Sequence, residues 1–247
     1  MSIWGLSGFY YYTSIKFIKV ESQITITLTS CGRFDLLEKT ITSVAKFWDG
    51  PPPIAFFINE DSGLPLPVEI GEFIAWKWPD CEYKEFAGYK NQIAAIDRMY
   101  KEVETPYIMH LECDWEFFKT GFVLKSLSIL EEKAHIMQIW LRSPNDRNGH
   151  PAIGQVLTTE DGVKYQMMKT GYRGVWNGFS FNCGLRRLSD YQKLFPNGMY
   201  ADVHWSPSNP LQAEQLVGKQ YFKHGFRAAT LLEGFCVHTG INRHISG

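Results

Sequence analysis

The stretch YIMHLECDWEF, residues 107–117, places carboxylates directly after an apolar run. Glu112 and Asp114 are one residue apart, so their side chains point to the same side of an extended backbone. A third acid, Glu116, follows at once. Carboxylate oxygens are the ligands that hard divalent cations such as Mg²⁺ and Mn²⁺ prefer. The spacing therefore predicts a metal site where a strand ends.

Two other apolar runs also end in polar residues. The run at 24–28 is followed by Thr-Ser-Cys-Gly-Arg at 29–33, and the run at 54–58 is followed by Asn-Glu-Asp at 59–61. Open α/β sheets bind ligands at the carboxyl ends of their strands, where such loops meet. The three polar segments are therefore expected to lie at one edge of a parallel sheet.

Strands and helices alternate around these segments. Helical spacing of apolar residues predicts helices over 35–48 and 90–103, with Asp35 as the N-cap of the first. Strand, helix and strand in that order indicate a parallel βαβ unit. A weak strand is expected near 81–86. Further strands are expected at 134–141, 164–168, 178–184 and 227–240, with helices at 121–132, from about 189, and at 211–226.

Length and composition favour a single α/β domain. The chain has 247 residues, of which 45% are hydrophobic and 21% charged, and a net charge of −1, which argues against a nucleic-acid binder. Five scattered cysteines without a Cys-x-x-Cys pair indicate reduced thiols and a cytoplasmic location. Residues 1–22 make a poor signal peptide, no apolar run is long enough to span a membrane, and this segment is expected to pack on the domain at 23–247.

The chain resembles a glycosyltransferase of the GT-A fold, similar to family 2, from about residue 23 to 240. ITITLTSCGRFDLLEKTITSV is similar to the first strand, loop and helix of that class, and FFINEDSG resembles its second strand. YIMHLECDWEF looks like the strand that leads into its Asp-x-Asp motif, with Glu112 in place of the first aspartate. The resemblance implies a Rossmann-like single domain with a mostly parallel sheet flanked by helices. Its nucleotide-binding half would span about 23–118 and its acceptor-binding half about 119–247.

The resemblance implies a metal-dependent transferase. Such an enzyme moves a sugar from a nucleotide-diphosphate donor, with a UDP-sugar favoured, to a hydroxyl of a glycan or other acceptor, more often with inversion. Mn²⁺ or Mg²⁺ would bridge the two phosphates and act as a Lewis acid on the departing diphosphate. Asp114 would be the direct ligand and Glu112 a second or water-mediated one. His238, at the end of a late strand, would complete the shell, with His244 as a weaker substitute.

In inverting members of this class, an acid at a helix start takes the proton of the acceptor hydroxyl. Glu214 matches that position, although the usual Glu-Asp pair is Glu-Gln here, and Asp202 is the reserve base. On the acceptor side, Trp176 would stack on a sugar face, with Asn177 and Gly178 beside it. His204 and Trp205 form a second acceptor cluster with Asp202.

The remaining expected site residues would contact the nucleotide or the donor sugar. They lie in the polar loops and on the helix before the metal strand: Thr29, Ser30, Arg33, Glu60, Asp61, Asn91, Asp97, Glu112 and Cys113. The guanidinium of Arg33 suits a phosphate because it can donate two parallel hydrogen bonds.

Two functions other than sugar transfer also fit the sequence. A nucleotidyltransferase or phosphohydrolase also needs a cation between carboxylates and phosphates, although the chain lacks a Gly-x-x-x-x-Gly-Lys phosphate loop. The aromatic content would suit a non-catalytic carbohydrate-binding domain, but the βαβ layout does not. The chain fits either a soluble enzyme or one part of a longer, multi-domain protein.

Overall fold

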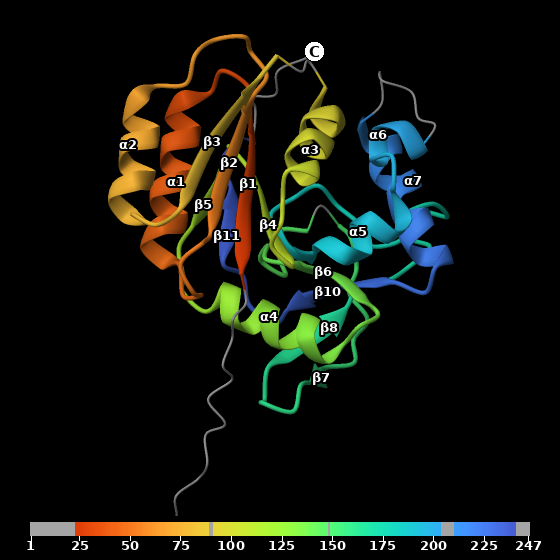
Figure 1. Cartoon of the computed structure of the whole chain (residues 1–247). Helices are drawn as coiled ribbons and strands as arrows, with labels where there is room; N and C mark the ends of the chain where they lie inside the picture. Colours follow the sequence, from red (N-terminus) through yellow and green to blue (C-terminus); the bar gives the residue numbers. More distant parts are fainter. Residues whose placement is uncertain (1–22, 89–90, 148, 204–209, 241–247) are drawn as a thin grey trace, which may run out of the picture.

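A nine-stranded sheet organises the protein, as seen in a computed structural model that describes residues 23–88, 91–147, 149–203 and 210–240 (Figure 1). Seven of its strands run in one direction, and β8 and β9 run in the other. In spatial order the strands are β3 (Glu82–Ala87), β2 (Ala55–Glu60), β1 (Ile24–Ser30), β4 (Tyr107–Glu112), β9 (Gly184–Arg187), β6 (Ile136–Trp140), β10 (Arg227–Leu231), β8 (Lys164–Met167) and β7 (Leu157–Thr158).

Helices cover both faces of the sheet (Figure 1). Their apolar side chains fall into two separate buried clusters, one on each face. One face carries α1 (Phe34–Phe47), α2 (Val68–Lys77) and α4 (Phe122–Glu132). The other carries α3 (Gln92–Lys101), α5 (Leu188–Leu194), α6 (Met199–Asp202) and α7 (Pro210–Lys223).

Strand β1 shows how the sequence selects these faces. Its residues are all buried, and they alternate between apolar and hydroxyl side chains. Ile24, Ile26 and Leu28 pack in the cluster beneath α1, because successive side chains point to opposite faces. On the other face, Thr25 forms a 2.8 Å hydrogen bond with Thr105, which satisfies a hydroxyl that is otherwise costly to bury.

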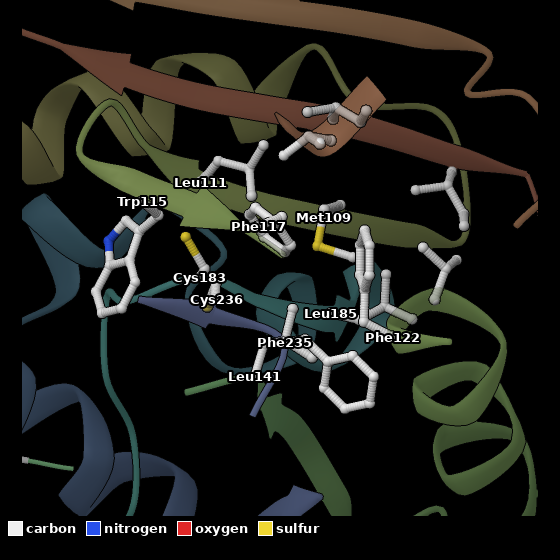
Figure 2. Close-up of a cluster of buried hydrophobic side chains, with 14 of the residues drawn as sticks. Met109, Leu111, Trp115, Phe117, Phe122, Leu141, Cys183, Leu185, Phe235 and Cys236 are labelled. Atoms are coloured by element: carbon white, nitrogen blue, oxygen red, sulfur yellow. The ribbon is translucent and has the colours of Figure 1, made fainter. Parts of the chain in front are cut away.

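A second, two-stranded sheet joins the segment that follows β4 to the C-terminal part of the chain. In it β5 (Trp115–Phe117) pairs antiparallel with β11 (Cys236–His238). Figure 2 shows the core beneath it, where Trp115 and Phe117 lie close to Cys183, Cys236 and the neighbouring apolar side chains. The core residues labelled there come from β4, β5, α4, β9 and β11 and from residues next to β6, β9 and β11: Met109, Leu111, Trp115, Phe117, Phe122, Leu141, Cys183, Leu185, Phe235 and Cys236.

The expected α/β class with a mostly parallel sheet is confirmed, but several elements differ. Helix α2 was not expected, because Ile70 and Ile74 are its only buried residues and prolines precede it. The strand expected at 178–184 begins only at Gly184, and the one expected at 227–240 is split between two sheets. Asp35 lies in the first turn of α1, whose N-cap is Arg33. Among the described residues, no helix has the length and apolar character needed to cross a bilayer.

Candidate active site

Asp114 lies in the turn between β4 and β5 and is held from three directions. Its Oδ2 accepts a hydrogen bond of 2.8 Å from Nη1 of Arg33 and lies 3.2 Å from Nε2 of His238. Its backbone carbonyl accepts hydrogen bonds from the amide and the hydroxyl of Thr239 at 2.8 and 3.0 Å. Gly240 approaches so closely that a Cβ there would lie 2.3 Å from Oδ2. The segment after β11 therefore closes over this carboxylate.

The environment of Asp114 favours its ionised form. Burial opposes ionisation, but the hydrogen bond from His238 and the positive charge of Arg33 outweigh it, so the pKa of Asp114 lies below its usual range. Its other oxygen, Oδ1, is buried and has no hydrogen-bond partner among the described residues. An anionic carboxylate with an unused oxygen beside an imidazole is a donor set that fits a divalent cation.

The described residues supply only part of a metal shell. Within them, no group of three or more His, Cys, Asp and Glu side chains is arranged to hold a metal ion. Asp114 and His238 form a pair, and a cation there would need further oxygens from a ligand or from water. This arrangement suits a cation that arrives with a diphosphate better than a permanently bound structural ion.

Glu112 is half-buried at the end of β4, and both of its oxygens are hydrogen-bonded. Nε2 of Gln92 donates to Oε1 at 2.6 Å, and Nε1 of Trp115 donates to Oε2 at 3.1 Å. Burial, with the negative charge of Asp114 as a second cause, raises the pKa of Glu112 to about 7. Glu112 therefore exchanges its proton near neutral pH, unlike Asp114.

Glu60 braces the loops after β1 and β2. Its Oε1 accepts hydrogen bonds of 2.8 Å from the amides of Gly32 and Ser62. Gly32 has a φ of +65°, a left-handed conformation that glycine adopts readily. Nearby, Asn59 donates from Nδ2 to Oδ1 of Asp61, whose pKa is raised to about 6 mainly by burial.

Four buried side-chain oxygens at this edge have no hydrogen-bond partner among the described residues. They are Ser30 Oγ, Asn59 Oδ1, Glu60 Oε2 and Asp114 Oδ1. Ser30 lies opposite Glu60 in the parallel β1–β2 register, and Thr29 of β1 lies opposite both Asn59 and Glu112. Buried polar groups are nearly always satisfied in native proteins. Their concentration where β1, β2 and β4 end indicates a site for a polar ligand.

Glu214 approaches this edge from α7. Its Oε1 accepts hydrogen bonds from the hydroxyl of Ser180 at 2.9 Å and from the amide of Phe181 at 2.7 Å. Burial raises its pKa, although these two hydrogen bonds and the charges of Arg186 and Arg142 oppose the shift. Because α7 begins at Pro210, Glu214 lies one turn inside the helix rather than at its start.

In the folded chain Glu214 lies within electrostatic range of Glu112, although the two are 102 positions apart in the sequence. The negative charge of Glu214 contributes to the raised pKa of Glu112. Arg142, at the end of β6, is buried, stacks on the ring of Trp115 at 4.8 Å and pairs with Asp146 at 2.8 Å. The site therefore combines Asp114, a carboxylate of lowered pKa, with Glu112 and Glu214, two carboxyl groups of raised pKa. Two arginines, Arg33 and Arg142, lie beside them.

Three residues expected to contact the nucleotide-sugar, Asp97, Asn91 and Cys113, make contacts within the protein. Asp97 is buried and accepts hydrogen bonds from the hydroxyl of Tyr191 and from the amides of Met199 and Tyr200, which ties α3 to α6. Asn91 caps α3 by accepting from the amides of Ile93 and Ala94. The thiol of Cys113 is buried and accepts a hydrogen bond from Arg33 at 3.2 Å.

The expected acceptor residues are also engaged by the protein. Trp176 is only 4% exposed, donates from its indole to the carbonyl of Phe179, and packs against His150, so its faces are not open to a sugar. Asn177 is buried, accepts from the amide of Gly171 and donates to the carbonyl of Val175. Gly178, with a φ of +94°, forms the adjoining turn and packs on Ala228.

The reserve base Asp202 lies at the end of α6. It accepts hydrogen bonds from the amide and the side chain of Asn197, so it closes its own loop. The neighbouring candidates His204 and Trp205 and the alternative ligand His244 lie outside the described residues.

Sequence reasoning missed several residues that hold the site. Asn59 and Trp115 lie in the segments 54–61 and 107–117, in which the sequence pattern indicated only the neighbouring carboxylates as site residues. Gln92, Ser180, Arg142 and Arg186 carry no local signal, because they reach the carboxylates only through the fold.

No protein-family model matches this sequence, and no curated protein matches it either. Similarity appears in three dimensions instead. The chain is similar to S. aureus TarS 1-349, solved with UDP, with a TM-score of 0.59 and 12% identity over 87% of this chain and 59% of that one. It is similar to the mannosyltransferase PcManGT of Pyrobaculum calidifontis, solved with GDP-Man and Mn²⁺, with a TM-score of 0.60 and 11% identity over 88% and 56% of the two chains.

GalNAc-T7, solved with UDP, GalNAc and Mn²⁺, has a TM-score of 0.61 and 10% identity over 87% of this chain and 43% of its own. The chain thus spans less than two thirds of the length of these proteins. At such low identities the likeness establishes architecture. The chain shares the α/β architecture of these three proteins, the GT-A fold.

Proposed function

We propose that the chain is a glycosyltransferase domain that binds a nucleoside-diphosphate sugar together with Mn²⁺ or Mg²⁺ and transfers the sugar to an acceptor hydroxyl with inversion. The observation that carries the proposal is the group of four unpartnered buried polar atoms, Ser30 Oγ, Asn59 Oδ1, Glu60 Oε2 and Asp114 Oδ1, at the carboxyl ends of adjacent strands. Their loops would hold the nucleotide. UDP is favoured because TarS and GalNAc-T7 were both solved with it.

Asp114 and His238 would hold the cation, with Glu112 beside them. When bound, a divalent cation neutralises a diphosphate and makes it a better leaving group. Arg33, which pairs with Asp114, would offer its guanidinium to a phosphate oxygen. Glu214 would take the proton of the acceptor hydroxyl, because its raised pKa lies closer to the pH at which it must accept a proton.

Thermal unfolding with UDP-sugars and GDP-sugars, with and without Mn²⁺, tests the binding part of this proposal. A ligand that binds only the folded state at a hundred times its Kd stabilises it by about 2.7 kcal/mol. Asp114→Asn removes the charge with little change in shape, and we expect it to abolish the Mn²⁺-dependent rise in Tm. Glu116→Gln is the matched control, because Glu116 is an acid two residues away that pairs with Lys39.

A Mn²⁺-dependent rise in Tm that survives Asp114→Asn would rule out the metal assignment. The products separate the remaining functions. A glycosyltransferase releases a nucleoside diphosphate and a glycosylated acceptor, whereas a nucleotidyltransferase releases pyrophosphate. Sugar binding that is indifferent to nucleotide and metal would instead favour a carbohydrate-binding domain.

A further inference from the structure

Arg186 is a buried cation without an acidic hydrogen-bonding partner. It lies in β9, between β4 and β6, and is 4% exposed. Among the described residues it forms no ion pair, and its guanidinium donates only to neutral oxygens. Its guanidinium also lies 5.1 Å from the ring centroid of Phe179, and its charge acts on Glu214 without a hydrogen bond between them. Burying a charge that no carboxylate contacts directly is costly, so the groups that its hydrogen bonds hold in place bear on why it is there.

The guanidinium of Arg186 holds one short segment, residues 180–182. Its Nη2 donates to the carbonyl of Ser180 at 2.6 Å and to that of Asn182 at 3.3 Å. Gln138 grips the same segment from β6, donating to the carbonyl of Ser180 at 2.8 Å and accepting from its amide at 3.2 Å. On its other side Arg186 donates from Nη1 to the hydroxyl of Tyr100 at 2.9 Å.

This segment is the one that holds Glu214. The Ser180 hydroxyl and the Phe181 amide both donate to Oε1 of Glu214. Oε2 receives no hydrogen bond from the described residues and is not among their fully buried polar atoms. One oxygen of the carboxylate is thus fixed, and the other is left for a proton.

We infer that Arg186 is a positioning residue for Glu214: by fixing the carbonyls of Ser180 and Asn182, it holds the two donors that orient the carboxylate for proton abstraction from an acceptor. The inference rests on the proposed role of Glu214 as the general base. A base displaced by about 1 Å loses on the order of a hundredfold in rate. An arginine that keeps the base in place therefore increases the rate, which would explain why it is retained in the core.

Arg186→Met removes the guanidinium and keeps an unbranched apolar side chain in place of the aliphatic part of arginine. Arg186→Lys keeps the charge but not the forked geometry, and it also serves if the methionine variant does not fold. Tyr100→Phe is the matched control, because it removes a hydrogen bond from the same guanidinium on the side away from Glu214. Glu214→Ala supplies the reference for a broken Phe181–Glu214 contact, because alanine has no oxygen to accept from the Phe181 amide.

Two measurements test the inference: one reports the Phe181–Glu214 hydrogen bond, and the other reports the catalytic rate. The first is the backbone amide signal of Phe181 in ¹H–¹⁵N spectra. We expect it to move toward its Glu214→Ala position in Arg186→Met, to move less in Arg186→Lys, and to stay in place in Tyr100→Phe. The second is turnover of whichever UDP- or GDP-sugar the wild-type protein uses. Arg186→Met should lower kcat tenfold or more, with the donor KM and the affinity for UDP with Mn²⁺ within twofold of wild type, and Arg186→Lys should recover part of the loss.

A folded Arg186→Met or Arg186→Lys protein with the wild-type Phe181 signal and kcat within twofold would overturn the inference. Equal losses in Tyr100→Phe would also overturn it, because they would show a general packing effect. If the wild-type protein turns over no donor, the proposed function fails, and the Phe181 signal alone still decides whether Arg186 positions Glu214.

Discussion

At the scale of single residues, Glu214 and Asp114 are two carboxylates with opposite environments. Burial dominates at Glu214 and raises its pKa, whereas at Asp114 the effects of His238 and Arg33 exceed that of burial and lower it. A raised pKa suits a group that must collect a proton, and a lowered pKa suits one that must stay charged beside a cation. This difference supports the roles proposed for them, Glu214 as the base and Asp114 as a ligand of the cation.

Glu214→Gln tests the base directly. The amide keeps the shape of the side chain but cannot take up a proton, so we expect kcat to fall by about 10² to 10⁴ with little change in donor affinity. In the wild-type protein, kcat should rise with pH through the raised pKa of Glu214, because only the ionised form is a base. Steady-state kinetics between pH 4.5 and 8 would show this rise.

Asp202→Asn is the control for that experiment, since Asp202 was the other candidate base and closes the loop with Asn197. We expect it to retain turnover. The opposite result, activity in Glu214→Gln and none in Asp202→Asn, would transfer the role to Asp202.

At the scale of elements, α3 connects the end of β4 to the second half of the fold. Asn91 caps its N-terminus, Gln92 in its first turn reaches Glu112, and Asp97 in its middle holds the start of α6. The helix was expected to contact the donor through Asn91 and Asp97. Its described contacts are instead structural, and the residue that reaches the site is Gln92.

Asn91→Ala and Asn91→Ser separate capping from donor binding. Serine is also a good N-cap and alanine is not, so we expect only Asn91→Ala to lose about 1 kcal/mol of unfolding free energy, measured in urea. Both variants should bind UDP with Mn²⁺ like wild type. A loss of nucleotide affinity shared by the two variants would instead restore Asn91 as a donor contact.

At the scale of the whole molecule, buried groups pull the pH dependence of stability in opposite directions. The pKa of His110, fully buried in β4, lies well below its usual value, chiefly because of burial. Below about pH 6.5 the unfolded chain binds a proton that the folded chain refuses, so stability falls as pH falls. Glu112 has the opposite effect on stability. Its pKa is raised to about 7, so as pH falls the folded chain binds this proton before the unfolded chain does, and stability rises.

His110→Gln should isolate the histidine contribution. Relative to wild type, the variant is expected to gain stability as pH falls from 6.5, by up to about 1.4 kcal/mol per pH unit. Urea unfolding at pH 7.5 and 5.5 on both proteins measures the difference, in which the effect of Glu112 is common and cancels. A difference that does not change with pH would contradict the assignment.

The alternation of Ile24, Ile26 and Leu28 with threonines, and the acids that follow β2 and β4, were sufficient to predict the parallel half and its polar edge. These signals are local, since strand period and terminal side chains belong to neighbouring residues. Helix α2 escaped prediction because only Ile70 and Ile74 give it an apolar face. The break between β10 and β11 escaped it because each strand pairs with a distant partner.

The sequence by itself determined which strand ends carry charge, and with it the class of fold. Only the tertiary structure decided which residues share the site: it brought His238 to Asp114 and Glu214 toward Glu112, and it buried Trp176 and Asp97. The physical reason is that burial, pKa and hydrogen-bond partners depend on groups distant in the chain, and a residue's type and its neighbours in the chain do not specify those groups.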